Sequence, residues 1–157
     1  MDQLDRLSQQ CVLDIIHKVN DMTLATVRPD GFPQATTVSY AHDGLTFYVG
    51  IGLDSQKAHN IRQNNKVSLT ITPPYRDWSH IKGLSLAALA EFVKEADEMQ
   101  LAADCMIRRF PQIKTMTAGA DALPWAGAVF IKITPQVISL LDYEKGFGHT
   151  ELYAVPS

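Results

Sequence analysis

Residues 45–69 read LTFYVGIGLDSQKAHNIRQNNKVSL, and this segment predicts a strand, a turn, a short helix and a second strand. Residues 45–49 are rich in aromatic and β-branched side chains and follow an Asp-Gly turn signal. Ala58 and Ile61 have the spacing of one face of a helix. The segment therefore predicts a strand that leads through a glycine-containing turn into a helix.

The start of this helix predicts an anion site. Asp54 or Ser55 can cap the helix, which leaves Lys57 in the first turn, where the helix dipole disfavours a cation. A bound phosphate explains that lysine, because free backbone N–H groups, the Ser55 hydroxyl and the Lys57 ammonium would converge on it. The alternative interpretation is an exposed lysine beside an ordinary cap, since one charge at a helix end contributes only about 0.3–1 kcal/mol.

Two better-known phosphate motifs do not fit this segment. Gly50-Ile51-Gly52 begins like a dinucleotide fingerprint, but Ser55 stands where the third glycine belongs and no parallel βαβ unit surrounds it. The P-loop pattern also fails, because no glycine precedes Lys57 and no Ser or Thr follows it.

The composition predicts an ordinary globular domain. The chain has 157 residues, of which 46% are hydrophobic and 20% are charged, enough for one domain whose core needs no disulfide or metal. A net charge of −3 argues against a nucleic-acid surface, which needs clustered Lys and Arg. Uncharged runs stay well below the roughly 20 residues of a membrane-spanning helix. We expect neither a nucleic acid nor a membrane as partner.

The cysteines and histidines predict no special chemistry. Cys11 and Cys105 are the two cysteines, and with no signal peptide in the chain they favour a reducing compartment, so we expect the cytoplasm. A disulfide between them stays open as an alternative. The five histidines form no ligand pair at helical spacing and neither cysteine is near one of them, so no metal site is predicted.

The first third of the chain predicts a helix and an antiparallel meander. Residues 2–19 have an amphipathic helical pattern that would pack on a sheet. Residues 23–28 and 34–41 are strands joined by a Pro-Asp-Gly turn, and residues 45–49 extend them to a three-stranded meander. The predicted buried face of the helix consists of Leu4, Leu7, Cys11, Ile15 and Val19.

The rest of the chain adds strands and one helix. Pro111 ends the helix, and Pro135 separates the last two strands. One segment is ambiguous, because its alanines suit a helix while Gly83 and the lack of a cap favour the strand that we predict. Six or seven antiparallel strands with few helices indicate a small barrel. The predicted segments are strands at 67–72, 81–93, 125–134 and 136–141 and a helix at 96–110.

These segments resemble the pyridoxamine 5′-phosphate oxidase-like family of FMN-binding split-barrel proteins. The resemblance covers most of the chain beyond the first helix. The most specific element is SxKAHxIxxNxxVSL after a strand that ends FYV. The matching segments are MTLATVRPDGFPQ (22–34), LTFYVG (45–50), SQKAHNIRQNNKVSL (55–69) and PQVISLLDYEKGFGH (135–149).

The resemblance implies a mainly β (α+β) fold, an antiparallel split β-barrel with flanking helices. It implies a single domain over residues 1–157, with residues 1–20 as an N-terminal helix packed on the barrel. It also implies a homodimer with two FMN sites at the subunit interface. Trp78 and Trp125 would suit such an interface, where tryptophan is enriched.

The resemblance also implies which residues hold FMN. Ser55 and Lys57 fall where the family binds the FMN phosphate, in agreement with the helix-start argument. Gln56 replaces an arginine of the oxidases, so a bidentate charged contact is lost and we expect weaker FMN retention. The implied contacts along the flavin ring and beside the ribityl chain are Thr36, Thr37, Val38, Tyr48 and Val49.

The C-terminal tail corresponds to the family's substrate site. In the oxidases an arginine, and a histidine two residues later, bind the substrate. Here Phe147 stands at the arginine position, His149 at the histidine position and Glu151 at a further basic position. We expect Phe147 and His149 to bind a small-molecule substrate. We also expect a poor pyridoxamine 5′-phosphate oxidase, because a phosphate would lose a charged hydrogen bond of about 1.5–3 kcal/mol.

Three functions stay open. The first is an FMN-dependent oxidoreductase, in which the flavin carries out the chemistry and no catalytic side chain is assigned. The second is a flavin or haem carrier or sensor without turnover, which the same barrel could serve. The third is a reductase that uses the deazaflavin F420, because the phosphate site would accept either cofactor tail.

Overall fold

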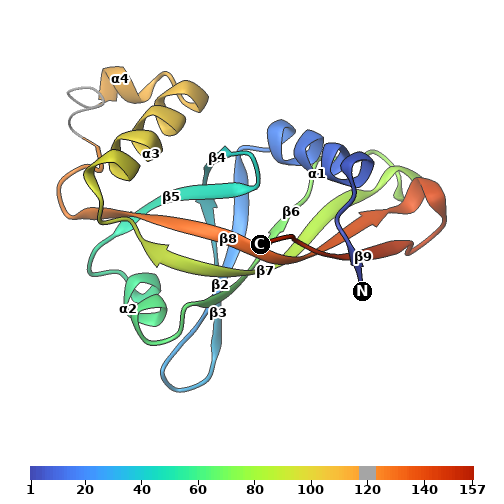
Figure 1. The fold of residues 1–157 in the computed structure, drawn as a ribbon, viewed down its shortest axis with the longest axis horizontal. Coiled ribbons are helices and arrows are strands. Elements are labelled where there is room, and N and C mark those ends of the chain that lie inside the picture. The colour runs from blue at the N-terminus through green and yellow to red at the C-terminus, as the bar shows by residue number, and fades with distance from the viewer. Residues whose placement is uncertain (117–122) are drawn as a thin grey trace.

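The computed structural model describes residues 1–116 and 123–157, which form one sheet with helices packed on it (Figure 1). The strands join in the order β1-β9-β8-β7-β6-β2-β3, while β5 pairs with β8 and β4 pairs with β5. The mainly β prediction with flanking helices is confirmed, although the β1–β9 pair is parallel and the sheet is not closed. The strands are β1 Asp2–Gln3, β2 Asp21–Val27, β3 Pro33–Ser39, β4 Ala41–Asp43, β5 Thr46–Gly52, β6 Lys66–Ile71, β7 Lys82–Phe92, β8 Ala128–Asp142 and β9 Thr150–Ala154. The helices are α1 Arg6–Lys18, α2 Gln56–Gln63, α3 Ala96–Arg109 and α4 Ile113–Met116, with short 3-10 turns η1 Trp78–His80 and η3 Tyr143–Lys145.

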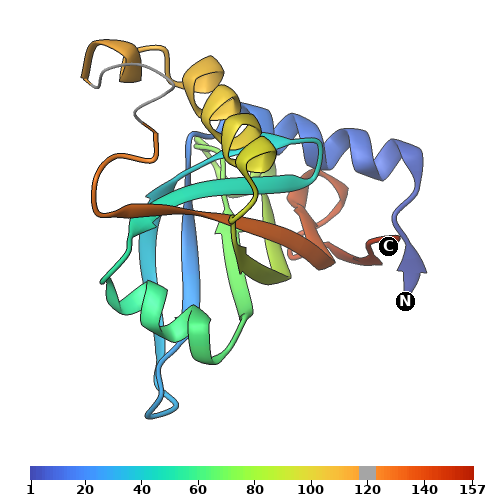
Figure 2. The ribbon, with the colours of Figure 1, turned by 60° about the vertical axis from the view of Figure 1, so that its left-hand side comes forward.

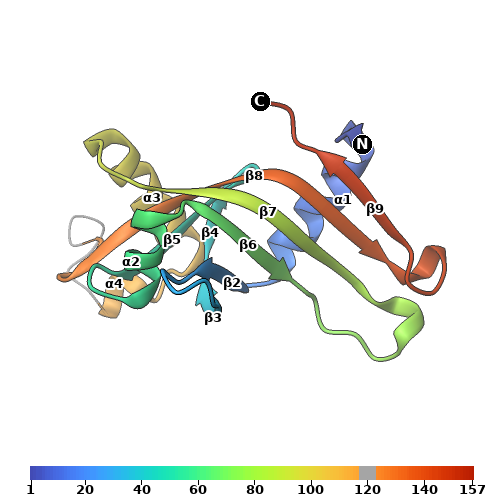
Figure 3. The same ribbon diagram turned by 90° about the horizontal axis from the view of Figure 1, so that it is seen from below.

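The long strand β8 joins the barrel to an extension of the sheet (Figure 3). One edge of β8 pairs with β7, whereas the other edge pairs first with β5 and then with β9. Pro135 lies between the β5 and β9 pairings, where its missing N–H breaks no ladder on that edge. The prediction of two strands separated at Pro135 is therefore wrong. The chain continues through Pro135 as one strand. Its pairing with β7 changes register between Ala87 and Ala88 of β7.

The N-terminal helix is shorter than predicted and packs through a different face. Asp5 caps α1 by accepting a hydrogen bond from the Ser8 N–H at 2.8 Å, and the residues before it pair with β9. The buried residues of α1 are Val12, Ile15 and Ile16, while Leu7 is 82% exposed. The prediction that Leu7 and Cys11 lie on the buried face of the helix is therefore wrong, because both are exposed. Two neighbouring stripes of the helix are apolar, and only packing selects between them.

The predicted meander holds for its first hairpin and fails at its third strand. β2 and β3 pair antiparallel around the predicted turn, where Gly31 has a φ of +88°. β5 does not pair with β3, which is an edge strand. It pairs with β4 and β8 instead. The chain changes direction at the buried Tyr40, whose hydroxyl donates to the Ile16 carbonyl at 2.7 Å.

The helices lie at two ends of the barrel (Figure 2). α1 and α3 both lie over one end, where Arg109 of α3 donates to the Ile16 carbonyl of α1, and α2 packs against β2 and β5 at the other. The main core joins α1 and α2 to the inner face of the sheet, and a second cluster joins α3 to β4 and β5. Among the described residues, no helix combines the length and hydrophobicity needed to cross a bilayer.

Candidate functional site

In the described part of the chain, the start of α2 presents unpaired backbone N–H groups beside a capping serine. Ser55 is the helix cap: its hydroxyl oxygen accepts from the Ala58 N–H at 3.2 Å and its proton goes to the Gly52 carbonyl at 2.7 Å. A hydroxyl has one proton to donate, so in this arrangement Ser55 stabilises the turn and offers no hydrogen to a ligand. The backbone N–H groups of Gln56 and Lys57 have no acceptor among the described residues.

Lys57 is the cation at this helix start. Its ammonium makes no hydrogen bond or ion pair with any described residue, and the side chain is only partly exposed. The side chain of Gln56 is engaged, because its Nε2 donates to Oδ1 of Asn60 at 2.8 Å. The free donors at the helix start are therefore two backbone N–H groups and the Lys57 ammonium.

Asn60 anchors α2 to the first hairpin, a role that the sequence interpretation missed. This side chain is fully buried, and its Nδ2 donates to Thr26 Oγ1 at 2.9 Å and to Gln34 Oε1 at 3.2 Å. Buried amides are retained where they are hydrogen-bonded. Helical spacing does not predict this burial, because Asn60 is one residue from Ile61 and two from Ala58, and residues at these separations do not share a helix face.

The three predicted flavin contacts on β3 do not share a face. Thr36 pairs with the buried Leu24, so its side chain and that of Val38 turn toward the core side of the sheet, whereas Thr37 turns outward. The Thr36 hydroxyl is buried without a hydrogen-bond partner. Because β3 is an edge strand, one row of its backbone groups is also unpaired within the sheet.

The structure buries the two predicted contacts on β5 on opposite sides. Val49 belongs to the main core, while Tyr48 packs in the α3 cluster and donates to Glu98 Oε2 at 3.3 Å. Burial, followed by the Glu98 charge, raises the pKa of Tyr48 to about 12. Neither side chain faces an open site, so only their backbone atoms could touch a cofactor.

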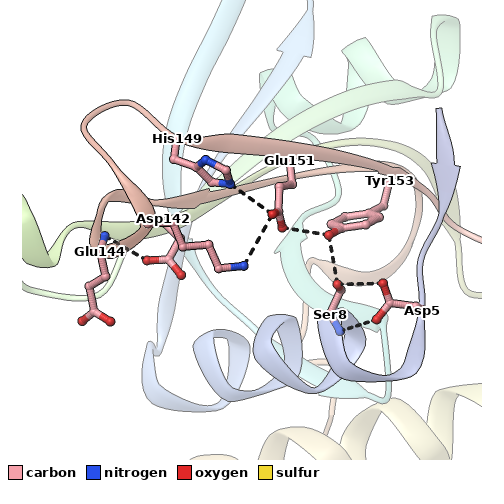
Figure 4. Close-up of polar contacts among 8 residues, drawn as sticks. Asp5, Ser8, Asp142, Glu144, His149, Glu151 and Tyr153 are labelled. Carbon is pink, nitrogen blue, oxygen red and sulfur yellow. Dashed lines mark hydrogen bonds and ion pairs between the residues drawn. The ribbon is translucent and has the colours of Figure 1, made fainter.

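The tail residues belong to a hydrogen-bonded network between β9 and α1 (Figure 4). His149 Nε2 lies 3.0 Å from Glu151 Oε1, and the Tyr153 hydroxyl donates to Glu151 Oε2 at 2.8 Å. Lys145 Nζ lies 3.4 Å from the same carboxylate. The hydrogen bonds from His149 and Tyr153 lower the pKa of Glu151 to about 2. The Ser8 hydroxyl lies 3.0 Å from both the Tyr153 hydroxyl and Asp5 Oδ2 and so ties the network to α1.

Phe147 is part of an exposed aromatic cluster. Its ring centroid lies 5.2 Å from that of Tyr143 and 6.0 Å from that of Trp78. Phe147 is 77% exposed and Trp78 is 64% exposed. The cluster offers apolar ring faces to a ligand or a partner and no charged group from these three side chains.

One chain does not bring the predicted cofactor and substrate residues together. α2 lies at one end of the long axis, and η3 with the loop to β9 lies at the other (Figures 1 and 3). Within one chain, the structure thus separates the predicted cofactor residues from the predicted substrate residues. Among the described residues, no group of three His, Cys, Asp or Glu side chains is arranged to hold a metal ion.

Comparison with known proteins agrees with this architecture. The family model described as pyridoxamine 5′-phosphate oxidase matches residues 9–142. No curated protein matches the sequence.

Several solved structures share the split-barrel fold. A conserved hypothetical protein from Mycobacterium tuberculosis is 25% identical, with a TM-score of 0.76 over 96% of each chain. A haem-binding protein from Mycobacterium smegmatis is 20% identical, with a TM-score of 0.74, and 89% of this chain spans 55% of that one. The haem storage protein HutZ from Vibrio cholerae is 18% identical, with a TM-score of 0.67 over 97% of this chain and 94% of that one.

Proposed function

This chain belongs to the pyridoxamine 5′-phosphate oxidase family, and from that premise we propose that it binds FMN and acts as an FMN-dependent oxidoreductase on a small molecule. The observation that carries the proposal is the start of α2, where two backbone N–H groups and the Lys57 ammonium have no partner among the described residues. Together with the helix dipole, these groups form a phosphate site.

The edge strand β3 supports a flavin ring beside that phosphate site. A buried hydroxyl without a partner is costly, and the Thr36 hydroxyl is such a group. The free backbone edge of β3 would supply further hydrogen bonds to the polar edge of an isoalloxazine ring. When bound, FMN would supply the hydride or electron transfer, and the protein would position and tune it.

The separation of the predicted cofactor and substrate residues leads us to propose a homodimer. The phosphate site at α2 lies at one end of the chain, and the loop from η3 to β9, which carries Phe147 and His149, lies at the other (Figure 3). A second copy would bring its tail to the first copy's α2 and complete the site. Closed two-fold dimers are the commonest oligomers, and they would make two equal sites.

The outer face of the sheet supports the same proposal. Two cross-strand rows run over six strands from β3 to β9, and every member is uncharged and at least partly exposed. An interface core is depleted of charge, so this face suits a second copy. One row is Ala35, Ala25, Ser68, Ala87, Val137 and Ala154, and the other is Thr37, Thr23, Thr70, Ser85, Ser139 and Leu152.

The aromatic cluster favours a planar, weakly charged substrate over a phosphorylated one. Phe147 stands beside Tyr143 and Trp78, and these rings would stack on a flat ligand. Glu151 is held ionised by its hydrogen bonds, and its negative charge would oppose a substrate phosphate. His149 would orient the substrate through its free Nδ1, because Nε2 is engaged with Glu151.

A second candidate function is haem binding. Two structures of the same fold are a haem-binding protein and a haem storage protein. In this chain His149 suits an axial ligand, because a carboxylate at Nε2 fixes its ring and leaves Nδ1 unbonded among the described residues. The adjacent aromatic cluster could pack against a porphyrin.

The cytoplasm remains our proposed location. Cys11 and Cys105 are both free thiols, Cys11 exposed and Cys105 buried. An unpaired exposed thiol is typical of a reducing compartment.

Absorption spectra and reconstitution test these candidates. The protein is titrated separately with FMN, F420 and haem. We expect FMN to bind, and Lys57→Ala to weaken FMN affinity at least about tenfold, as loss of a charge-assisted hydrogen bond predicts. Lys94→Ala, which removes an exposed lysine between β7 and α3, is the matched control and should bind FMN normally. Equal FMN affinity in the two variants would remove Lys57 from the site, and a haem Soret band lost in His149→Ala would favour the second candidate.

A further inference from the structure

α1, α3 and β4 approach one another at the end of the barrel opposite α2 (Figures 1 and 2). The side chains of these three elements line a groove. It contains a cavity of about 210 Å³ lined by His17, His42, Cys105, Arg108 and Arg109. An adjoining hollow of about 440 Å³ also contacts His17 and His42. The proposed FMN site uses none of these residues.

Arg109 brings a fixed positive charge to this groove. Its Nη2 donates to the Ile16 carbonyl at 3.0 Å and to the Val19 carbonyl, and its guanidinium lies 4.8 Å from the centre of the Tyr40 ring. Its Nε is buried without a hydrogen-bond partner. Carbonyls and a ring hold this guanidinium, but no carboxylate among the described residues neutralises it. A partly buried charge without a counter-ion favours an anionic ligand.

Two further cations border the groove without partners. Arg108 lines the cavity and Lys18 lines the adjoining hollow, and neither makes a hydrogen bond or ion pair with a described residue. The rings of His17 and His42 meet edge to face, with centroids 6.2 Å apart. His42 Nδ1 lies 3.0 Å from the Gly44 carbonyl, so its Nε2 is left for a ligand.

The nearby carboxylates do not neutralise these cations. Asp14 lines the adjoining hollow and accepts a hydrogen bond from Gln10 Nε2 at 2.9 Å. Asp43 at the end of β4 is exposed. Neither forms an ion pair with Lys18, Arg108 or Arg109 in the described part of the chain. Burial lowers the pKa of His42 most and Arg109 lowers it further, whereas the hydrogen bond to the Gly44 carbonyl and the Asp43 carboxylate raise it.

We propose that this groove binds a phosphate group, held by Arg108, Arg109 and Lys18 and contacted by the two histidines. Guanidinium groups form bidentate hydrogen bonds with phosphate oxygens. Cations from two helices can contact more oxygens of a tetrahedral anion than one residue can. The phosphate could be free or part of an ester. The adjoining hollow would hold the rest of an ester ligand.

The experiment uses the ring-proton NMR signals of His17 and His42 as local reporters. The full-length protein is titrated with inorganic phosphate and, separately, with glycerol 3-phosphate. We expect saturable shifts of both rings, with tighter binding of the ester if the hollow contributes. No shift with either ligand up to tens of millimolar would overturn the proposal.

Variants separate a specific site from general charge effects. Arg108→Gln should weaken the affinity about tenfold or more and leave the fold intact, because Arg108 has no partner to lose. Arg109 is kept because it holds the end of α1. Arg76→Gln removes an exposed arginine between β6 and η1 and is the matched control. An equal effect of the two substitutions would refute the site. Lys57→Ala should leave the shifts unchanged, which distinguishes this groove from the FMN site whether or not FMN binds.

Discussion

His149 and Glu151 lie on the same side of the chain at the start of β9, with Nε2 and Oε1 3.0 Å apart. The imidazole stands where the family resemblance implied a substrate ligand, and the carboxylate stands where it implied a basic residue. Tyr153 and Lys145 share the same carboxylate. The tail is therefore a hydrogen-bonded unit before any ligand arrives (Figure 4).

Replacing Glu151 should reduce the acid sensitivity of the fold. Hydrogen bonds from His149 and Tyr153 lower the pKa of Glu151 from 4.5 to about 2. A lowered folded pKa adds stability that is complete above the unfolded value and is lost as the pH falls from 4.5 toward 2. Glu151→Gln should lose stability at neutral pH and show a smaller further loss on acidification. Urea unfolding across that pH range measures both effects.

Glu91→Gln is the control, because Glu91 is exposed on β7 and has no partner among the described residues. An identical pH profile for the two variants would show that the Glu151 contacts do not stabilise the fold.

Gly50 should not tolerate a side chain. A Cβ at this position would lie 3.0 Å from Cη2 of Trp125, closer than carbon atoms normally approach. Gly50→Ala should displace the half-exposed indole and lower stability by less than the roughly 1–3 kcal/mol of overpacking in a closed core. At Gly52 the nearest atom would be Ser55 Cβ at 3.6 Å, so Gly52→Ala should be close to neutral. Tryptophan fluorescence in a Trp78→Phe background, with thermal unfolding, distinguishes the two outcomes.

Asn60 should be essential for holding α2. Asn60→Ala removes the donor to Thr26 and Gln34 and the acceptor for Gln56, which leaves buried polar groups unpaired. We expect a loss of about 2–3 kcal/mol and weaker FMN binding, because α2 would shift on the hairpin. Asn65→Ala is the control, since that side chain is exposed and unbonded in the described structure. Urea unfolding measures the loss of stability, and FMN titration measures the loss of FMN affinity. A change no greater than in the control would contradict the anchoring role.

A charge on the outer sheet face should dissociate the proposed dimer. Thr70 lies between Thr23 and Ser85 in one of the uncharged rows. Thr70→Glu would bury a carboxylate in the interface, whereas Gln9→Glu adds the same charge on the exposed side of α1. Light scattering should give a dimer for the wild type and the control and a monomer for Thr70→Glu. A wild-type monomer at micromolar concentration with FMN bound would refute the shared site.

The FMN-loaded protein should be a poor pyridoxamine 5′-phosphate oxidase. Phe147 supplies no charge to a substrate phosphate, and Glu151 is ionised. Phe147→Arg should tighten binding of pyridoxamine 5′-phosphate about ten- to a hundredfold, the value of one charged hydrogen bond. Phe147→Leu removes the ring without adding charge and serves as the control. Oxygen-dependent turnover by the wild type at the level of a dedicated oxidase would show that the tail is aligned incorrectly.

Local patterns were sufficient for the elements themselves. The α2 segment, the β2–β3 hairpin, β7 and α3 all form where periodicity, turn residues and caps predict them. The adjacent residues also predicted a cap at Asp54 or Ser55, of which the structure uses Ser55, and placed Lys57 in the first turn of the helix. Such features depend on interactions within one or two helical turns or one hairpin, so the sequence contains their cause directly.

Long-range packing decided the rest. The choice between two apolar stripes of α1, the pairing of β5 with β8 and the pairing of β9 with β8 all depend on segments far apart in the chain. The sequence does not distinguish Asn60 from an exposed polar residue of a helix. Its role depends on the hydrogen bonds to Thr26 and Gln34, which lie far away in the chain. The groove at Arg109 likewise exists only where α1, α3 and β4 meet. Several pairings satisfy the same local preferences. The pairing that buries the most apolar surface while bonding most of the buried polar groups is selected only in three dimensions.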